Sequence, residues 1–474
     1  MSGIGVKTND GKAVELSTEA LAGLRGGLRG TLCLPGDPGY DEARTLWNAM
    51  HDKKPALIVR AAGASDVMLA VKTAAEHGLL LAVRGGGHNI AGNAVCEGGL
   101  MLDLSLMKSV RVDPSAKTAR VEPGARLSDL DRETQAFGLA TPVGINSTTG
   151  VAGLILGGGF GWLSRKFGLT IDNLISADVV TAKGELVKAS ASDNPDLFWA
   201  IRGGGGNFGV VTSFELKLHA VGPQVIAGLI VHPFSHAKEV LYEYRKAVAN
   251  APDELCCWVV MRKAPPLPFL PPEVHGTEIL VLAMCYAGDV AAGEKAVAPF
   301  KAIGKPIADV VGPSPFVGWQ TAFDPLLAPG ERNYWKSHDF VELKDGLIDA
   351  LLDAVRRLPS PDCEVFIGNL GGQINRVAAD ATAYPHRSVN FVMNVHTRWS
   401  TPAQDKECIA WARELYDKSA AFATGGVYVN FMPDDETQRV RSGAYGGNYD
   451  RLAKLKNKYD PKNLFRLNQN VAPQ

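Results

Sequence analysis

The sequence predicts an α+β protein of two domains, and three observations support this class. At 474 residues the chain is too long for one typical hydrophobic core. A strand–helix–strand pattern over residues 56–83 runs directly into a cluster of glycines. From about residue 221 the glycine clusters thin out, and longer apolar strands alternate with helices. We therefore expect a glycine-rich first domain over 1–220, a second domain over 221–424, and a segment over 425–474 that returns to the first domain.

Composition and charge exclude several classes of function. Hydrophobic residues make up 46% of the chain and charged residues 21%, as in ordinary globular proteins. The formal net charge of -1 gives no general attraction to nucleic acid or to an anionic membrane, so we expect neither as a partner. The N-terminal residues lack the profile of a signal peptide, and no apolar run is long enough to span a bilayer. The seven cysteines include no CxxC pair, so we expect reduced thiols, no metal site and a cytoplasmic location.

The first domain is expected to begin with a β-α-β unit. Residues 56–60 form a buried strand, Ser65 is the expected cap of the following helix, and Gly78 ends it before a second strand over 79–83. The remaining expected elements are strands near 100–104 and 118–121, a helix capped at Ser128 with Asp131 three residues on, a hairpin of 175–181 with 185–188, a helix over 196–202 and a strand over 210–218.

The second domain is expected to be α/β, built on a mostly antiparallel sheet. Its clearest helices are predicted over 237–249, 343–358 and 402–422. Connections rich in proline or glycine are expected at 265–272 and 311–315.

Three glycine-rich loops indicate the chemistry: Gly85–His88, Gly157–Gly161 and Gly203–Gly209. Successive backbone N–H groups without Cβ atoms form a nest that cradles a pyrophosphate. The third loop formally contains GxGxxG, but its order is helix, loop, strand rather than strand, loop, helix, which excludes a Rossmann fold. We therefore predict a large phosphate-bearing cofactor in a cradle that is not of the Rossmann type.

The glycine strings resemble those of a known superfamily. The strings are Arg84–Asn89, Gly150–Gly161, Leu197–Gly205 and Asn207–Thr212, with a tail of Tyr445–Tyr449, Lys458–Pro461 and Asn463–Phe465. Together they resemble the vanillyl-alcohol-oxidase superfamily, whose FAD-binding domain is of the PCMH type with two subdomains. The berberine-bridge-enzyme-like branch is the most similar part, including bacterial D-6-hydroxynicotine oxidases and sugar oxidases. The resemblance covers nearly the whole chain.

The resemblance implies FAD as the cofactor, tethered covalently through His88. Many relatives carry a second tether, a cysteine at the position that Asn146 occupies here, so the resemblance implies a mono-covalent flavin with no cysteinyl link. Thr149 is expected near the flavin edge, where relatives control the access of oxygen. The implied FAD-binding residues are Arg84, Gly85, Gly86, Gly87, His88, Asn89, Pro142, Asn146, Thr149, Gly150, Gly153, Gly158, Phe160, Gly161, Val211, Asn448 and Tyr449.

The catalytic base is the point at which this chain departs from the family. Several relatives place a tyrosine or a charged residue where this chain has Phe431, which takes no proton. Residues 427–431 are expected to form a strand, on which Tyr428 would point away from the face of Phe431. The base is therefore missing or comes from elsewhere. The candidates for polar groups that contact substrate are Tyr334, Lys336, Glu364, Asn369 and Tyr428, with further histidines at His338 and His386.

The resemblance implies an oxidase of a small organic substrate. A hydride would pass from a C–H beside O or N to flavin N5, and O2 would reoxidise the flavin and release H2O2. The alternatives are an FAD-dependent dehydrogenase, a biosynthetic oxidative cyclase and, more distantly, a flavin-binding protein without turnover. The sequence does not name the substrate or the oligomeric state.

Overall fold

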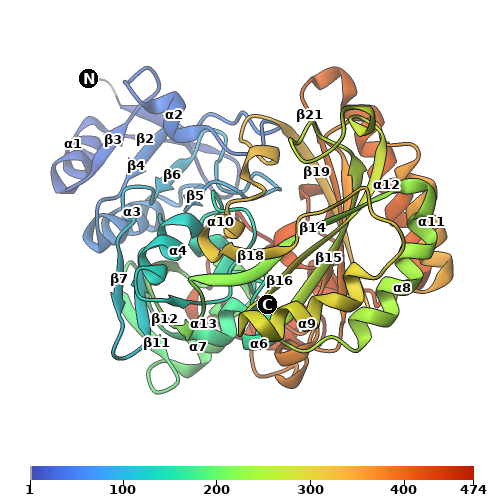
Figure 1. The fold of residues 1–474 in the computed structure, drawn as a ribbon. Helices are drawn as coiled ribbons and strands as arrows, with labels where there is room; N and C mark the ends of the chain where they lie inside the picture. Colours follow the sequence, from blue (N-terminus) through green and yellow to red (C-terminus); the bar gives the residue numbers. More distant parts are fainter. Residues whose placement is uncertain (1–2) are drawn as a thin grey trace.

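The computed structural model describes residues 3–474 and contains three main sheets. In Figure 1 two smaller sheets lie in the glycine-rich half of the molecule, drawn in blue to green, and a large sheet with its helices lies in the other half. The α+β class and the antiparallel second sheet are confirmed. The strands of that large sheet fall within residues 224–399, while the boundaries at 220 and 424 stay a prediction.

The first sheet has the order β3-β4-β6-β5, with β4, β6 and β5 parallel. Its elements are α1 (Thr18–Gly27), β3 (Thr31–Cys33), β4 (Leu57–Arg60), α3 (Ala64–His77), β5 (Leu81–Arg84) and β6 (Leu100–Asp103). The expected β-α-β unit is present, and Gly78 ends α3 in the left-handed conformation, with φ of 61°. The expected cap at Ser65 is wrong, because the helix already begins at Ala64. The Asp66 carboxylate instead accepts N–H bonds from Arg29, Gly30 and Ala62.

The second sheet is antiparallel, with the order β11-β10-β12-β8-β7. Its elements are β7 (Val110–Asp113), β8 (Thr118–Val121), α4 (Leu127–Gln135), β10 (Leu174–Val180), β11 (Leu186–Ser190), α7 (Pro195–Ile201) and β12 (Val210–Lys217). The expected hairpin and the helix before the third glycine loop are confirmed. The cap at Ser128 is wrong, because α4 already begins at Leu127. Its cap is Arg126, two residues earlier, whose N–H donates to the carboxylate of Asp129 at 2.9 Å. Asp131 is buried against Gln320 instead.

The third sheet has eight antiparallel strands in the order β17-β14-β16-β15-β20-β21-β19, with β18 paired to β14. The strands are β14 (Gln224–Pro233), β15 (Leu255–Lys263), β16 (Glu278–Tyr286), β17 (Ala308–Asp309), β18 (Gly312–Pro315), β19 (Arg332–Phe340), β20 (Glu364–Asn369) and β21 (Phe391–Trp399). Strands β15, β20 and β21 are neighbours although more than 100 residues separate β15 from β20. This order brings distant polar residues side by side.

Helices cover the outer face of the large sheet, as Figure 1 shows, and leave its inner face toward the glycine loops. These helices are α8 (Ala237–Ala249), α9 (Val290–Lys301), α11 (Asp345–Val355) and α12 (Asp405–Ser419). The helix predicted over 237–249 has those bounds. The helices predicted over 343–358 and 402–422 are shorter, because their ends form turns and 3-10 segments.

The C-terminal segment returns to the glycine-rich half through α13 (Tyr449–Tyr459). The Nζ atom of Lys456 lies 2.8 Å from the carbonyl oxygen of Asn207 and 2.7 Å from the carboxylate of Asp460, and all three residues are buried. The strand predicted over 427–431 is absent. A 3-10 turn at Val429–Phe431 follows Tyr428 instead, so the alternation of faces assumed for Tyr428 and Phe431 does not apply.

The remaining short elements connect these layers. They are β1 (Ile4–Lys7), β2 (Ala13–Leu16), α2 (Tyr40–Arg44), β9 (Leu139–Ala140), α5 (Val151–Leu156), α6 (Ser164–Phe167), β13 (His219–Ala220) and α10 (Phe316–Gln320). No helix of the described residues is long and apolar enough to cross a membrane.

Candidate active site

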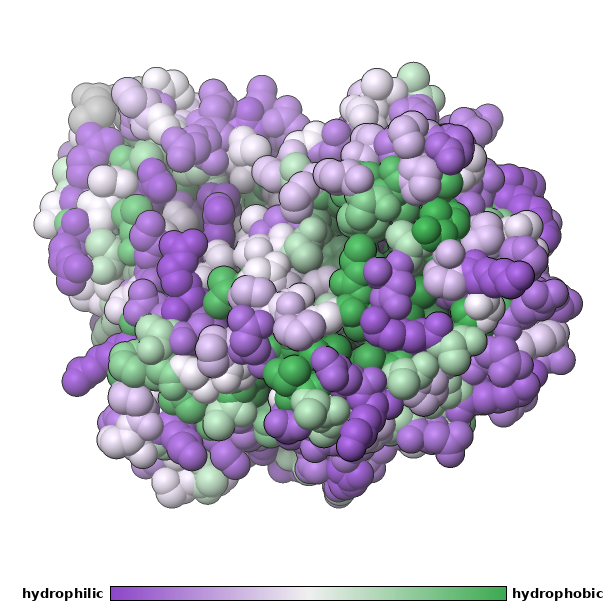
Figure 2. Space-filling view, in the orientation of Figure 1, coloured by the Kyte–Doolittle hydropathy of each residue, from purple (hydrophilic) through white to green (hydrophobic). Residues whose placement is uncertain are grey.

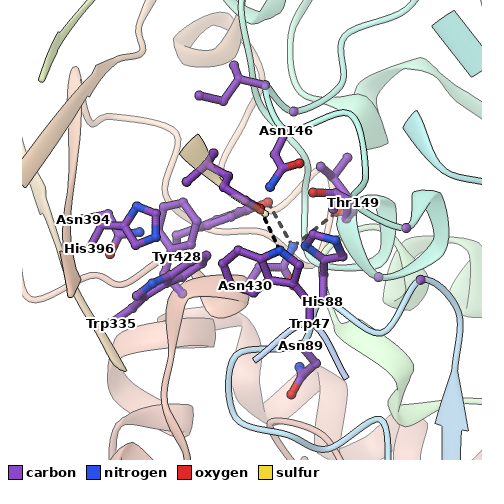
Figure 3. Close-up of a pocket in the computed structure, with 18 of the residues that line it drawn as sticks. Trp47, His88, Asn89, Asn146, Thr149, Trp335, Asn394, His396, Tyr428 and Asn430 are labelled. Atoms are coloured by element: carbon purple, nitrogen blue, oxygen red, sulfur yellow. Dashed lines mark hydrogen bonds between the residues drawn. The ribbon is translucent and has the colours of Figure 1, made fainter. Parts of the chain in front are cut away.

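A cavity of about 380 Å³ lies between the glycine loops and the inner face of the large sheet. Residues of all three loops line one side, and side chains of β14, β15, β16, β19, β20 and β21 line the other. Figure 3 shows the two sides: His88 and Thr149 come from the glycine-rich half, and Trp335, Asn394 and His396 from the sheet. The volume is in the range of small-molecule sites.

The glycines let two loops meet backbone to backbone. A Cβ on Gly86 would lie 2.3 Å from the Cα of Gly150, and a Cβ on Gly161 would lie 1.9 Å from the carbonyl oxygen of Val143. No side chain fits at these positions. A Cβ on Gly153, by contrast, would meet nothing within 4 Å, and Gly153 lines the cavity. The backbone at Gly86, Gly150 and Gly153 therefore lines the cavity without an intervening side chain.

The first loop offers backbone donors to a ligand. Gly87 has a φ of +73° and follows Gly86, a succession that turns neighbouring N–H groups toward one side. Among the described residues, the N–H groups of Gly86, Gly87 and His88 donate to no protein acceptor. Such a nest suits an anion, as the sequence predicted for a pyrophosphate.

His88 is held in one orientation at the edge of this loop. Its Nε2 lies 3.1 Å from Oγ1 of Thr148, whose hydroxyl donates to Oδ1 of Asn146 at 2.8 Å. Because the threonine proton is used there, Nε2 of His88 carries the imidazole proton and Nδ1 keeps a free lone pair. Burial, with Arg126 nearby, lowers the pKa of His88 to about 3. The ring is therefore neutral and nucleophilic at neutral pH.

Aromatic rings from the large sheet, the C-terminal segment and the second glycine loop form a cluster in the cavity. Trp258 and Phe366 stack with centroids 5.4 Å apart and planes 18° apart. Phe431 meets Phe366 edge-on at 5.9 Å and Trp335 edge-on at 5.5 Å. Phe160, from the second glycine loop, contacts Trp258 and Phe431 at 5.8 Å each. These five residues are named the aromatic box below.

A polar triad interrupts the aromatic wall. Nη1 of Arg262 donates to Oε2 of Glu364 at 2.7 Å, and Nδ1 of His396 lies 3.0 Å from Oε1 of the same carboxylate. Burial favours the neutral acid, but Arg262 and His396 outweigh it and lower the pKa of Glu364 to about 2. The carboxylate is thus charged throughout the physiological range. All three side chains line the cavity, and Nε2 of His396 is buried with no partner among the described residues.

Comparison with known proteins agrees with this geometry. An FAD-binding-domain family model matches residues 55–190, and a berberine and berberine-like model matches residues 427–472. An FAD-linked oxidoreductase of Dictyostelium discoideum is 35% identical over 433 residues, which cover 90% of this chain and 91% of the relative.

Solved structures share the fold. The 6-hydroxy-D-nicotine oxidase of Arthrobacter nicotinovorans has a TM-score of 0.84 at 28% identity, over 94% of this chain and 98% of that chain. The xylooligosaccharide oxidase of Myceliophthora thermophila C1 has a TM-score of 0.83 at 26% identity, over 95% and 98% of the two chains.

The chain belongs to the berberine-bridge-enzyme-like family of FAD-linked oxidoreductases.

The cavity fits the cofactor of this berberine-bridge-enzyme-like protein. Bare backbone at Gly86 and Gly153, and the free N–H groups of the first loop, provide the cradle that a pyrophosphate needs. Most of the predicted FAD-binding residues line the cavity: Gly85, Gly86, Gly87, His88, Asn89, Asn146, Thr149, Gly150, Gly153, Phe160 and Val211. These residues would hold FAD.

Other predicted FAD-binding residues do not line the cavity. Arg84 points to the back of its loop, where Nη1 donates to the carbonyl oxygen of Ala43 at 2.8 Å. Asn448 donates to the carbonyl oxygen of Ala379 at 2.9 Å, near the surface. The others outside the cavity lining are Pro142, Gly158, Gly161 and Tyr449. Gly161 shapes the wall from behind through its contact with Val143.

Among the predicted catalytic candidates, Tyr334 and Lys336 lie on the wrong face of β19. The Tyr334 hydroxyl donates to Asp435 at 2.7 Å, and Lys336 forms a buried ion pair with Glu436 at 2.7 Å. Trp335, between them, faces the cavity. His338 likewise stacks on Tyr416 outside it. The choice of face was wrong because β19 is polar or aromatic on both sides.

The other candidates divide between the cavity and its surroundings. Glu364 lines the cavity, as expected, while Asn369 lies at the far end of β20, outside the lining. Nε2 of His386 donates to the carbonyl oxygen of Ala444 at 3.1 Å, away from the cavity. Tyr428 lines the cavity together with Phe431, their centroids 4.9 Å apart, so the predicted opposition of these two rings is wrong.

Sequence reasoning missed several cavity residues. They are Trp47, Trp258, Arg262, Trp335, Asn394, His396, Asn430, Tyr445 and Gln469. Charged or polar residues inside otherwise apolar strands were the available signal for Arg262 and His396. A metal centre was not expected, and no group of His, Cys, Asp or Glu in the described part of the chain has the arrangement for one.

Proposed function

We propose that this FAD-linked oxidoreductase is an oxidase of a small organic substrate, with O2 as the electron acceptor. The observation that carries the proposal is the two-sided cavity, with the cofactor cradle on one wall and a polar triad in an aromatic wall on the other. When bound, FAD accepts a hydride from a C–H beside O or N and passes the electrons to O2, giving H2O2. Relatives named as oxidases of 6-hydroxynicotine and of oligosaccharides support the class.

His88 is proposed as the covalent attachment point, through Nδ1. Its neutral ring, its fixed orientation and the free lone pair at Nδ1 support nucleophilic attachment. No second tether is expected, because no cysteine among the described residues lines the cavity and Asn146 lies at the position of the cysteinyl link. The amide of Asn146 instead holds Thr148.

The chain's own residues bind, orient and exclude water. The loop Gly85–His88 would hold the phosphates and one edge of FAD, and the aromatic box would cover the substrate side. Thr149 lines the cavity close to His88 and is proposed as the residue that adjusts access of O2. A dehydrogenase with another acceptor would share all of this geometry, so the acceptor must be measured.

A denaturing gel viewed under ultraviolet light after acid treatment tests the tether. Flavin fluorescence should travel with the wild-type band and be absent from His88→Ala. His51→Ala is a matched control, since His51 lies outside the cavity lining. Yellow native protein with a dark band would overturn the tether alone, and colourless protein that takes up no FAD would overturn the proposed function.

The acceptor is tested by reducing the protein anaerobically and then admitting O2. Rapid return of the oxidised flavin spectrum with formation of H2O2 is expected of an oxidase. Reoxidation by a quinone or dye, but only slowly by O2, would show a dehydrogenase instead.

A further inference from the structure

Neither of the two residues nearest to the expected tyrosine position takes up a substrate proton. Phe431 has no ionisable group. The Tyr428 hydroxyl accepts bonds from the N–H of Gly159 and from Nδ2 of Asn430, at 3.0 Å each. Burial raises the pKa of Tyr428 to about 12, so it stays protonated. Another group in the cavity must receive the proton that leaves with an oxidised alcohol.

We infer that His396 is this proton acceptor, and that the substrate is an aromatic alcohol whose ring lies within the aromatic box. The inference rests on the proposed function, because the proposed FAD supplies the electron acceptor. Two observations support it independently: the protonation pattern of the triad, and the scarcity of polar groups on the sheet wall.

The triad fixes which nitrogen of His396 is free. Nδ1 lies 3.0 Å from a carboxylate oxygen of Glu364, which only accepts, so Nδ1 carries the proton of the neutral ring. Nε2 therefore presents a lone pair. It is buried, lacks a partner among the described residues and belongs to a side chain that lines the cavity. A carboxylate behind a histidine is the arrangement that orients the ring and stabilises its protonated form.

Arg262 keeps the carboxylate of Glu364 ionised. It contacts the oxygen of Glu364 that His396 leaves free, at 2.7 Å. Arg398, further along β21, adds a second positive charge near Glu364, while its own Nη2 bonds the carbonyl oxygen of Ala328. Glu364 and Arg262 are positioning residues, since the free atom that meets the substrate is Nε2 of His396.

The wall of the cavity that the large sheet forms is too apolar for a carbohydrate. Apart from the indoles of Trp258 and Trp335, the described side chains of the large sheet that line the cavity include four polar ones: Arg262, Glu364, Asn394 and His396. Two of these four, Arg262 and Glu364, bind each other. The buried atoms left without a partner are Nε2 of His396, Oδ1 of Asn394 and the indole nitrogens of Trp258 and Trp335. A sugar ring carries a hydroxyl on nearly every carbon, and the described part of this wall offers only these four free polar atoms to pair with them.

A flat ring with one polar substituent matches the same wall. The box supplies stacked and edge-on ring faces, and one hydroxyl would reach His396. The loop after β15 continues the apolar surface, since Pro265, Leu267, Phe269 and Leu270 also line the cavity. Figure 2 shows hydrophobic residues gathered toward the middle of this half of the molecule, with hydrophilic residues around the periphery.

The proposed step balances as the oxidation of an alcohol to a carbonyl compound. The O–H bond breaks and its proton moves to Nε2 of His396. The C–H bond on the same carbon breaks, and its electron pair leaves as a hydride to the FAD of the proposed function. A C=O double bond forms, and the product is an aromatic aldehyde or ketone.

The test uses FAD-loaded protein with 4-methoxybenzyl alcohol and 2-naphthalenemethanol, against xylobiose and glucose. We expect the aromatic alcohols to perturb the flavin spectrum and to reduce it, and the sugars to do neither. In His396→Gln, kcat/KM should fall by about 10² to 10⁴-fold, with unchanged flavin content, and the acidic limb of the pH profile should disappear. Added imidazole should partly restore turnover in His396→Ala.

Glu364→Gln separates positioning from chemistry. In Glu364→Gln the acidic limb of the pH profile of kcat/KM should remain but shift in pH, whereas in His396→Gln this limb should be absent. Because Glu364→Gln leaves Arg262 without its anion, the double variant with Arg262→Met serves if the single variant folds poorly. Asn369→Ala is the control at the far end of β20 and should leave kcat/KM unchanged.

The outcomes distinguish this inference from the proposed function. Protein that is reduced by dithionite and reoxidised by O2, yet oxidises xylobiose and no aromatic alcohol, would overturn the inference and leave the oxidase standing. Wild-type kcat/KM and pH profile in His396→Gln would also overturn it, as would failure of both aromatic alcohols to bind the FAD-loaded protein. Absence of FAD would overturn the proposed function itself.

Discussion

The imidazole of His88 lies flat against the indole of Trp47, with ring centroids 5.0 Å apart and planes 20° apart. Trp47 is itself held at two points. Its indole Nε1 donates to the carbonyl oxygen of Leu327 at 2.9 Å, and its backbone N–H donates to the carbonyl oxygen of Gly87 at 3.1 Å. One tryptophan thus links the first glycine loop to the half of the molecule that contains the large sheet.

Replacing Trp47 by leucine should slow the proposed attachment of flavin to His88 without unfolding the protein. The ring of His88 would lose the surface that sets its plane, and misplacement of a nucleophile costs about 10 to 100-fold in rate. The measurement is the time course of in-gel flavin fluorescence after FAD is added to apoprotein. Trp411→Leu, at a buried indole outside the cavity lining, is the control and should attach flavin at the wild-type rate. Equal rates in both variants would contradict the role of Trp47.

Asp131 should make stability depend on pH in an unusual direction. Its carboxyl is buried against Nε2 of Gln320 at 2.9 Å, and burial raises its pKa from 3.8 to about 7. Since the folded pKa is the higher one, this stability is fully present below pH 4 and is lost as the pH rises through 7. Asp131→Asn should therefore match the wild type near pH 3.5 and exceed it by ~3 to 4 kcal/mol at pH 8. Urea unfolding at both pH values measures this, and parallel curves would contradict it.

Arg387 should be required for the two halves of the molecule to hold together. Its Nη1 and Nη2 each lie 2.7 Å from an oxygen of Asp172, and both side chains are nearly inaccessible to solvent. Arg387→Met leaves a buried carboxylate without its cation, at a cost of about 3 to 5 kcal/mol in the free energy of unfolding. Arg357→Met removes an exposed pair and should cost less than ~1 kcal/mol. Similar losses in the two variants would be the contrary result.

Tyr428 should stabilise the second glycine loop rather than take part in proton transfer. In Tyr428→Phe the buried N–H of Gly159 loses its acceptor, which costs about 1 to 3 kcal/mol in the free energy of unfolding. The shape of the pH–rate profile should stay as in the wild type, because the removed hydroxyl is not ionised. Tyr416→Phe, whose hydroxyl has no hydrogen bond among the described residues, is the control. Loss of one limb of the pH–rate profile in Tyr428→Phe would instead identify Tyr428 as the group that takes the substrate proton.

Local signals in the sequence predicted the cofactor side well. Glycine is needed at Gly86 and Gly150, where two backbones meet, and at Gly87, where the backbone turns. The clustering of glycines in the sequence therefore indicates this geometry directly. The β-α-β unit and the helix over 237–249 follow from periodicity within a short segment.

The substrate side could not be predicted in the same way, because non-local contacts determine it. Strands β20 and β21 are buried on both faces, so alternation did not indicate which face of His396 or Glu364 meets the cavity. The neighbours of Glu364 come from β15 and β21, and only the strand order places Arg262 and His396 beside it. For Tyr428 and Phe431 the error was local: an apolar pentapeptide fits a strand pattern, yet the chain turns there.

The position of the last 50 residues affects how the enzyme is made. Tyr428, Asn430, Tyr445 and Gln469 all line the cavity, so a chain still emerging from the ribosome has an incomplete pocket until residue 469 has been added. A complete cofactor cradle therefore requires the segment 425–474. A prematurely terminated product would be released with its flavin cradle open, and its lack of bound colour would mark it as defective.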